Sequence, residues 1–147
     1  MNKIIVQKGL LNCNINRAFE MFTVNEHLVK WLTMKSDVEP EVGGKYELFW
    51  TPEDPENNST IGCKVLEIDE PYLINFEWKG PVQYKIFMNY SDPLTNVTVT
   101  FHQIDNKTQV TLIHTGWQSE LDWEEARLYF SKAWEGAFKN LIDYVNQ

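Results

Sequence analysis

The residue types that most often carry out chemistry are few in this chain and widely spaced. The histidines are His27, His102 and His114, and no two of them stand at the short spacings of a metal site. A Cys-x-x-Cys pair, a serine-nucleophile elbow, a phosphate-binding loop and a dinucleotide fingerprint are all missing from the sequence. With 21 acidic residues, any chosen pair of carboxylates is uninformative. The sequence therefore predicts no metal site and no cofactor, and it offers no positive support for an enzyme.

His114 is the one histidine with a position suited to acid–base chemistry. It shares parity with the apolar residues of the alternating segment 108–117, so its side chain should face inward, whereas His102 should face outward. A single inward histidine is more often a hydrogen-bonded core residue than a catalyst. A cyclase-like or hydrolase-like enzyme that uses His114, with Tyr46 or Tyr84 as proton donors, stays open as an alternative.

A long C-terminal helix is the main element expected to position these side chains. Residues 122–147 carry apolar side chains at spacings of three and four, which is typical of an amphipathic helix. Ser119 or Asp122 is expected to cap its N-terminus. The predicted apolar face consists of Trp123, Ala126, Phe130, Ala133, Trp134, Ala137, Phe138, Leu141 and Val145. A face this long needs a broad apolar surface to pack against.

Most of the chain before this helix is expected to form β-strands. Alternating patterns and bounding turn residues predict strands over residues 3–12, 45–50, 60–68, 72–78, 95–103 and 108–117. After the first strand, Asn14 or Asn16 and then Asn25 are expected to cap two short helices. Residues 83–88 fit either a further strand or a packed loop. This order predicts an α+β fold in one domain of residues 1–147, with a curved antiparallel sheet around the C-terminal helix.

Composition narrows the classes of partner and location. The chain has 147 residues, 43% of them hydrophobic, and a formal net charge of −8 with no basic cluster, so we expect no nucleic acid and no membrane surface as partner. No segment is apolar enough to span a membrane. The two cysteines form no disulfide framework, which favours a cytoplasmic protein. We expect a monomer or a weak homodimer.

Several short motifs, in this order and at this spacing, resemble a known family. They are a short helix followed by a tryptophan (residues 26–32), a Gly-Gly turn before a strand (42–46), a Gly-x-Val-x-Glu-Ile-Asp, Pro, Leu and Trp series (62–78), His-Thr-Gly (114–116) and the helical Trp134. The chain resembles the homologues of the activator of heat-shock-protein-90 ATPase (AHSA-type), within the START and birch-pollen-allergen superfamily (SRPBCC). The motifs spread over residues 15–141. The stretch after Trp78 departs from the pattern, being longer and more aromatic.

The resemblance implies a helix-grip (START-like) fold, in which a curved sheet wraps around the long helix. Members of the superfamily include lipid carriers, aromatic polyketide cyclases and chaperone regulators, so the resemblance implies fold more narrowly than function. The chaperone role belongs to eukaryotic proteins with an additional N-terminal domain, which these 147 residues do not contain. A protein-interaction or co-chaperone-like domain is therefore kept as an alternative.

The leading hypothesis is a domain that binds a hydrophobic or aromatic small molecule between sheet and helix. Large apolar side chains aim into that space, and they either fill it as a core or leave a small cavity whose Trp and Tyr tips orient a ligand. The candidate cavity-lining residues are Trp31, Tyr46, Leu48, Trp50, Phe76, Trp78, Val99, Phe101, Leu112, His114, Phe130, Trp134 and Phe138. With so many large side chains, we expect a small or partly closed pocket.

Overall fold

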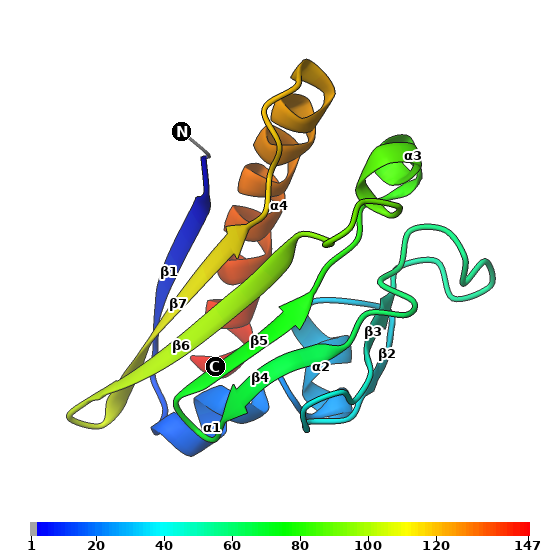
Figure 1. The fold of residues 1–147 in the computed structure, drawn as a ribbon. Helices are drawn as coiled ribbons and strands as arrows, with labels where there is room; N and C mark the ends of the chain where they lie inside the picture. Colours follow the sequence, from blue (N-terminus) through cyan, green and yellow to red (C-terminus); the bar gives the residue numbers. More distant parts are fainter. Residues whose placement is uncertain (1–2) are drawn as a thin grey trace.

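The computed structural model describes residues 3–147, and its main layer is an antiparallel sheet of five strands (Figure 1). The strand order is β1-β7-β6-β5-β4, and every neighbouring pair is antiparallel. The strands are β1 (Ile5–Leu11), β4 (Val65–Asp69), β5 (Leu73–Glu77), β6 (Asn96–Ile104) and β7 (Lys107–Thr115). The predicted antiparallel sheet is thus confirmed, with strand ends shifted by one to five residues.

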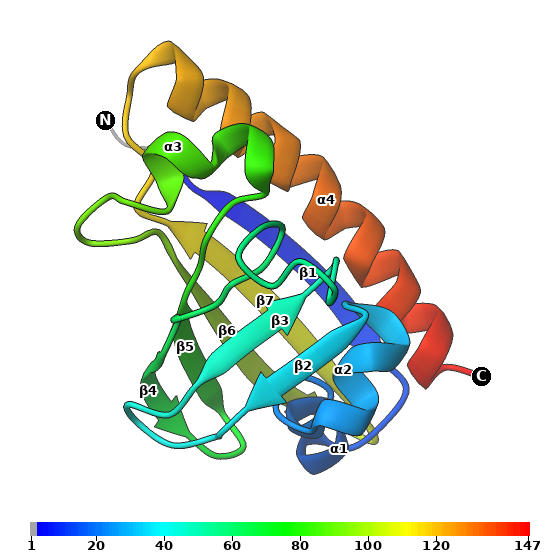
Figure 2. The ribbon, with the colours of Figure 1, turned by 90° about the vertical axis from the view of Figure 1, so that its right-hand side faces the viewer.

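A second ribbon, β2 (Lys35–Val38) paired with β3 (Tyr46–Phe49), continues the sheet around the core. Two isolated bridges, Lys45 to Lys64 and Phe49 to Ser59, connect β3 with the segment that leads into β4. Figure 2 shows the result, with β2 and β3 on the side of the core opposite β6 and β7. The strands therefore wrap around an interior rather than forming one flat layer.

The sequence prediction missed β2 and started β4 too early. Of the residues in β2 only Val38 is buried, so the segment has no alternation to detect. The expected strand over 60–68 is interrupted because Gly62 adopts a φ of +86° and the Cys63 N–H donates to Thr60 O in a turn. Pairing with β5 begins only at Val65, and its register shifts between Val65 and Glu67.

The two short helices are α1 (Ile15–Glu20) and α2 (Asn25–Trp31). The Asn14 side chain accepts a hydrogen bond from the Arg17 N–H at 2.9 Å, which confirms one predicted cap. The second prediction is wrong, since Asn25 is the first helical residue and Val24 is the N-cap. The Asn25 side chain instead accepts from the Val38 N–H, at 3.0 Å, and so ties α2 to β2.

The long helix α4 (Leu121–Val145) crosses the sheet and packs against β1 (Figure 2). Gly9 permits this close approach, since a Cβ at that position would lie 3.1 Å from Phe138 Cδ2. The helix begins after Glu120, which makes no side-chain capping bond, so neither Ser119 nor Asp122 is the cap. Its buried residues are Trp123, Ala126, Phe130, Trp134, Phe138, Leu141 and Val145. The predicted amphipathic helix is confirmed.

Residues 83–88, for which a further strand and a packed loop were both open, form short helical turns. Residues 80–94 contain a 3₁₀ turn, η1 (Val82–Tyr84), and a short helix, α3 (Lys85–Met88), so the strand alternative is wrong. Tyr84 packs against Tyr129 and Phe87 packs against Trp123, with ring centroids 5.3 and 5.1 Å apart. The segment therefore covers the N-terminal half of α4 (Figure 2).

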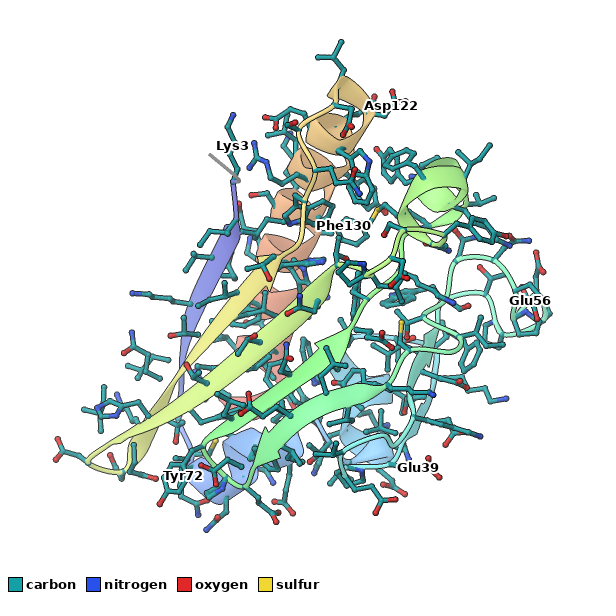
Figure 3. All side chains as sticks on the ribbon, viewed as in Figure 1. Lys3, Glu39, Glu56, Tyr72, Asp122 and Phe130 are labelled. Atoms are coloured by element: carbon teal, nitrogen blue, oxygen red, sulfur yellow. The ribbon has the colours of Figure 1, made fainter. Side chains whose placement is uncertain are left out.

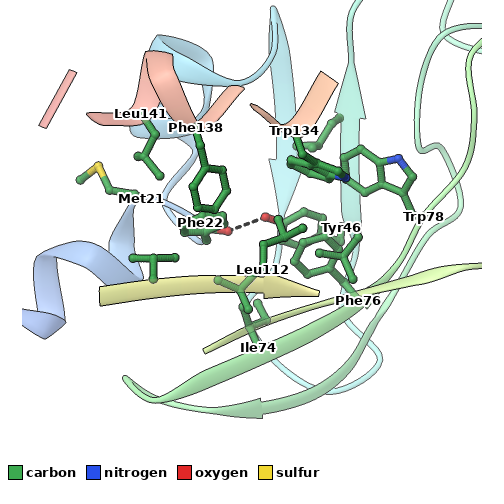
Figure 4. Packing of buried hydrophobic residues seen from close by; sticks show 14 of the residues in the cluster. Met21, Phe22, Tyr46, Ile74, Phe76, Trp78, Leu112, Trp134, Phe138 and Leu141 are labelled. Carbon is green, nitrogen blue, oxygen red and sulfur yellow. Dashed lines mark hydrogen bonds between the residues drawn. The ribbon is translucent and has the colours of Figure 1, made fainter. Parts of the chain in front are cut away.

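The core lies between the sheet, α1, α2 and α4, and aromatic rings fill much of it (Figure 3). Tyr46 stacks on Phe76 with centroids 3.7 Å apart, and its hydroxyl donates to Phe22 O at 2.7 Å (Figure 4). Tyr72 has the same parity as Ile74 and Phe76, which predicts an inner position, but its side chain is 58% exposed. It precedes β5 at the rim of the sheet, away from α4 (Figure 3).

Candidate functional site

A cavity of about 460 Å³ lies beside α4, on the side that faces β3 and the β3–β4 loop. Four parts of the chain form its wall: the end of α2, the segment from Trp50 to Ser59, the residues just after β5, and the middle of α4. Its lining consists of Trp31, Leu32, Trp50, Thr51, Asn58, Ser59, Trp78, Lys79, Gly80, Pro81, Tyr129, Phe130, Ala133, Trp134, Gly136, Ala137 and Asn140. Its volume is in the range of small-molecule sites.

Small side chains on one face of α4 leave room for this cavity. Ala133, Gly136, Ala137 and Asn140 recur at the helical spacing of three and four and line it together. Ala133 was expected in the core but is exposed, and Ala137 is only half-buried. These two alanines face the cavity because the larger rings at neighbouring helical positions already fill the space against the sheet. A Cβ at Gly136 would meet no atom within 4 Å.

Aromatic rings form another part of the wall. Trp78 is central, with its ring centroid 5.0 Å from that of Trp134, 5.9 Å from Trp50 and 6.4 Å from Phe130. Five of the candidate residues therefore line the cavity, these four and Trp31. Trp50 is 37% exposed, and its ring N–H donates to the Leu32 carbonyl at 2.9 Å, which holds it at the cavity edge.

The other candidate residues pack in the core and do not line this cavity. They project from β3, β5, β6, β7 and the C-terminal half of α4 into a space that their own rings fill (Figure 4). These eight are Tyr46, Leu48, Phe76, Val99, Phe101, Leu112, His114 and Phe138. The space between sheet and helix is thus divided, filled beneath the C-terminal half of α4 and open beside its middle.

His114 is fully buried behind Trp134, as its parity predicted, and both of its ring nitrogens have partners. The Trp134 indole N–H can only donate, so Nδ1 of His114 accepts this bond, at 3.1 Å. A neutral imidazole then carries its proton on Nε2, which donates to Thr95 Oγ1 at 3.0 Å. Burial lowers the pKa of His114 to about 3, which favours this neutral form.

His114 is hydrogen-bonded to Thr95 and Trp134, and not to Tyr46 or Tyr84, the tyrosines that the enzyme hypothesis would use as proton donors. The Tyr46 hydroxyl is committed to Phe22 O, and burial raises the pKa of Tyr46 far above its usual range. Tyr84 does not line the cavity, and its ring packs on Tyr129 with centroids 5.3 Å apart. Within residues 3–147, no three or more His, Cys, Asp or Glu side chains gather as a metal could require.

Sequence reasoning missed the polar part of the lining. Thr51, Asn58 and Ser59 belong to the loop that follows β3, a polar segment with two prolines that reads only as the end of a hairpin. Asn58 adopts a φ of +52° and accepts from the Val82 N–H at 3.0 Å, which joins this loop to the segment after β5. No periodic signal marks such residues, because two loops distant in sequence create their position.

Among residues 3–147, no helix has the length and apolar character needed to cross a membrane.

Comparison with known proteins places the chain in a family. The model of the activator of Hsp90 ATPase homolog 1-like proteins matches residues 12–146, nearly the whole chain. The chain belongs to this family. The AHSA1-like match confirms the family resemblance seen in the sequence motifs. The chain matches none of the curated protein sequences.

Solved structures share the AHSA1-like fold at low sequence identity. A protein from Mesorhizobium loti is 18% identical with a TM-score of 0.78, over 98% of this chain and 97% of that one. The Aha1 dimer from Colwellia psychrerythraea is 15% identical with a TM-score of 0.72, over 97% and 96%. An Hsp90 activator from Plasmodium falciparum is 19% identical with a TM-score of 0.71, over 94% and 92%. These similarities confirm the helix-grip fold class.

Proposed function

We propose that this AHSA1-like protein binds a hydrophobic, aromatic small molecule in the cavity beside α4. The observation that carries the proposal is the aromatic wall itself, in which Trp31, Trp50, Trp78, Phe130 and Trp134 surround a space of about 460 Å³. Cavities of this size, lined by apolar rings and a few polar groups, are the usual form of a small-molecule site. We also propose a cytoplasmic location, since Cys13 and Cys63 are both free.

A substitution that fills the cavity tests this proposal. Gly136→Trp places a large ring where the structure leaves open space, so we expect naphthalene, as an uncharged aromatic probe, to bind at least tenfold more weakly than to the native protein. Binding is measured by titration with two-dimensional NMR and by the rise in melting temperature that a ligand of the native state produces.

Two matched variants separate loss of space from loss of structure. Gly136→Ala adds only a methyl group at an exposed helical position, so it should keep probe binding and stabilise the protein by about 0.5–1 kcal/mol. Glu135→Trp adds the same ring at an exposed neighbour outside the lining and should leave binding unchanged. Native protein that binds naphthalene no better than Gly136→Trp does would refute the proposal.

A second candidate function is the binding of a protein partner through α3. The observation that favours it is an exposed apolar surface, here called the α3 patch, formed by Val82, Ile86 and Tyr90. Ile86 is 84% exposed and Tyr90 is 74% exposed. Such patches mark protein-binding surfaces more often than scattered single residues do. Family membership and the Plasmodium falciparum neighbour make an Hsp90-type chaperone the partner to try first, and the Colwellia psychrerythraea neighbour suggests a homodimer.

The ATPase rate of an Hsp90, with and without the purified chain, tests this second candidate. We expect stimulation, and we expect Ile86→Asp to raise the concentration for half-maximal stimulation about tenfold, because a charge would enter an apolar contact. Gly136→Trp changes the cavity and not the α3 patch, so it should stimulate like the native protein. Absence of both stimulation and binding would eliminate this candidate.

A further inference from the structure

The α3 patch lies between two acidic parts of the chain, and the first is the loop that follows β3. Lys85 of α3 holds this loop in place by donating to the Glu56 carbonyl and to Asn57 Oδ1, both at 2.8 Å. Asn57 in turn donates to the Asp54 carboxylate at 3.0 Å. Asp54 and Glu56 are both exposed, and Figure 3 shows Glu56 on the same side of the molecule as α3. Two acidic side chains therefore lie beside α3 on this loop.

The second acidic part is the N-terminal end of α4. Phe87 packs against Trp123 and Tyr84 packs against Tyr129, so α3 lies directly against this end of the helix. Glu125 belongs to the same turns of α4 and is exposed. Burial and, after it, the neighbouring Glu125 carboxylate raise the pKa of Tyr84, which indicates that this carboxylate lies close to α3.

These acidic side chains have no basic partners. Among residues 3–147, no carboxylate of Asp54, Glu56 or Glu125 takes part in an ion pair. The loop of residues 51–59 contains no basic residue, and Lys85 is the only one in residues 80–94. Both hydrogen bonds of the Lys85 ammonium group go to uncharged oxygens of the loop. An apolar patch with a negative potential around it is the result.

This combination of apolar centre and acidic border defines the chemistry of a partner. We propose that the α3 patch binds a polypeptide segment that presents apolar side chains flanked by Lys or Arg. The apolar side chains would cover Ile86 and Tyr90, and the basic ones would reach Asp54, Glu56 and Glu125. Apolar contact at the centre supplies affinity, and complementary charge at the rim selects the partner. The proposal rests on the second candidate function and names the partner's chemistry.

The same charges disfavour other occupants of the patch. In a two-fold dimer formed through α3, the acidic border of one copy would meet the identical border of the other, and like charges across an interface repel. A nucleic acid or an anionic membrane would be repelled for the same reason. A basic polypeptide is therefore the occupant that both the apolar and the charged features favour.

Two synthetic amphipathic peptides of about 18 residues, long enough to form helices, test the charge requirement. They carry leucine at the same positions and differ only in having lysine or glutamate at all the others. Each peptide is labelled with fluorescein and titrated with the full chain, and fluorescence anisotropy gives the dissociation constant. We expect the lysine peptide to bind at least tenfold more tightly than the glutamate peptide. Raising NaCl from about 50 mM to about 500 mM should weaken its binding.

Charge-reversal variants show whether the lysine peptide binds at the α3 patch. Glu56→Lys combined with Glu125→Lys reverses two exposed charges beside α3, so this peptide should bind about tenfold more weakly. Glu41→Lys combined with Glu67→Lys is the matched control, since it changes the net charge equally at exposed positions on the β2–β3 turn and on β4, away from α3 (Figure 1). The control should bind within about twofold of the native protein.

Three results would overturn the proposal: no binding of the lysine peptide, equal binding of the two peptides, or equal affinity in the two double variants. A dimer that analytical ultracentrifugation detects and Ile86→Asp abolishes would instead assign the patch to a second copy. Stimulation of Hsp90 that Ile86→Asp weakens and the Glu56→Lys/Glu125→Lys variant keeps would refute the basic partner and leave the second candidate function intact. If Hsp90 does not respond but the peptides follow the expected pattern, the Hsp90-type partner is eliminated and the basic class stands.

Discussion

Replacing Trp134 with Ala is expected to lower the free energy of unfolding by about 3–5 kcal/mol, the largest effect of any single substitution considered. Trp134 is only 2% exposed, although it lines the cavity, because its other face packs on Trp78 and its edge reaches His114. The substitution removes this packing and leaves His114 Nδ1 buried without its donor. Equilibrium unfolding in urea measures the loss.

Two variants show which part of the loss is packing. Trp134→Phe keeps a ring but removes the N–H, so we expect a loss of about 1–3 kcal/mol. Trp50→Ala removes an indole that is 37% exposed, and it should cost clearly less than Trp134→Ala. If Trp134→Ala cost under about 2 kcal/mol, Trp134 would be a wall of an open cavity and not part of the core.

Acidification from pH 7 to pH 5 is expected to remove about 2 kcal/mol of stability through His114 alone. In the folded protein burial lowers the pKa of His114 to about 3, whereas the unfolded chain takes up the proton near the ordinary value of 6.5. Below pH 6.5 the unfolded state therefore binds one more proton, and stability falls by about 1.4 kcal/mol per pH unit until the pH approaches 3. Urea unfolding at pH 7, 6 and 5 follows the trend.

His114→Gln is the matched variant for this measurement, because an amide can also accept from Trp134 and donate to Thr95 without titrating. Its stability should fall less between pH 7 and pH 5 than that of the native protein, by the same amount of about 2 kcal/mol. His102→Asn changes an exposed histidine and should keep the native slope. Equal slopes in the native protein and His114→Gln would show that His114 is not buried in neutral form.

Periodicity explains which elements the sequence predicted well. The apolar spacing of α4 and the alternation in β5, β6 and β7 are local patterns, and each of these elements buries one face. Parity also placed His114 inward and His102 outward, as the structure has them. The strand β2 was missed because its residues are mostly polar and only one of them is buried, so its pairing with β3 leaves no alternating pattern in the sequence.

The cavity could not be predicted from local periodicity, because it depends on how neighbouring side chains pack. Ala133 and Ala137 have the spacing of core residues, and only the position of the rings packed beside them shows that they face open space. Phe76 on β5 and Trp78 just after it share parity, yet Phe76 stacks on Tyr46 in the core and Trp78 lines the cavity. Parity defines a face of the sheet, and it contains no information on how far the opposite layer lies from that face.

The sequence by itself determined the fold class, the family and the inward direction of His114 and of most of the candidate aromatic side chains. Each of these follows from local periodicity or from the order of short motifs. The tertiary structure alone decided that the aromatic interior is filled beneath Phe138 and open beside Gly136, and that Trp78 Nε1 finds no acceptor within residues 3–147. Both facts depend on distances between segments far apart in the chain, because close packing in one region fixes how much space the next region keeps.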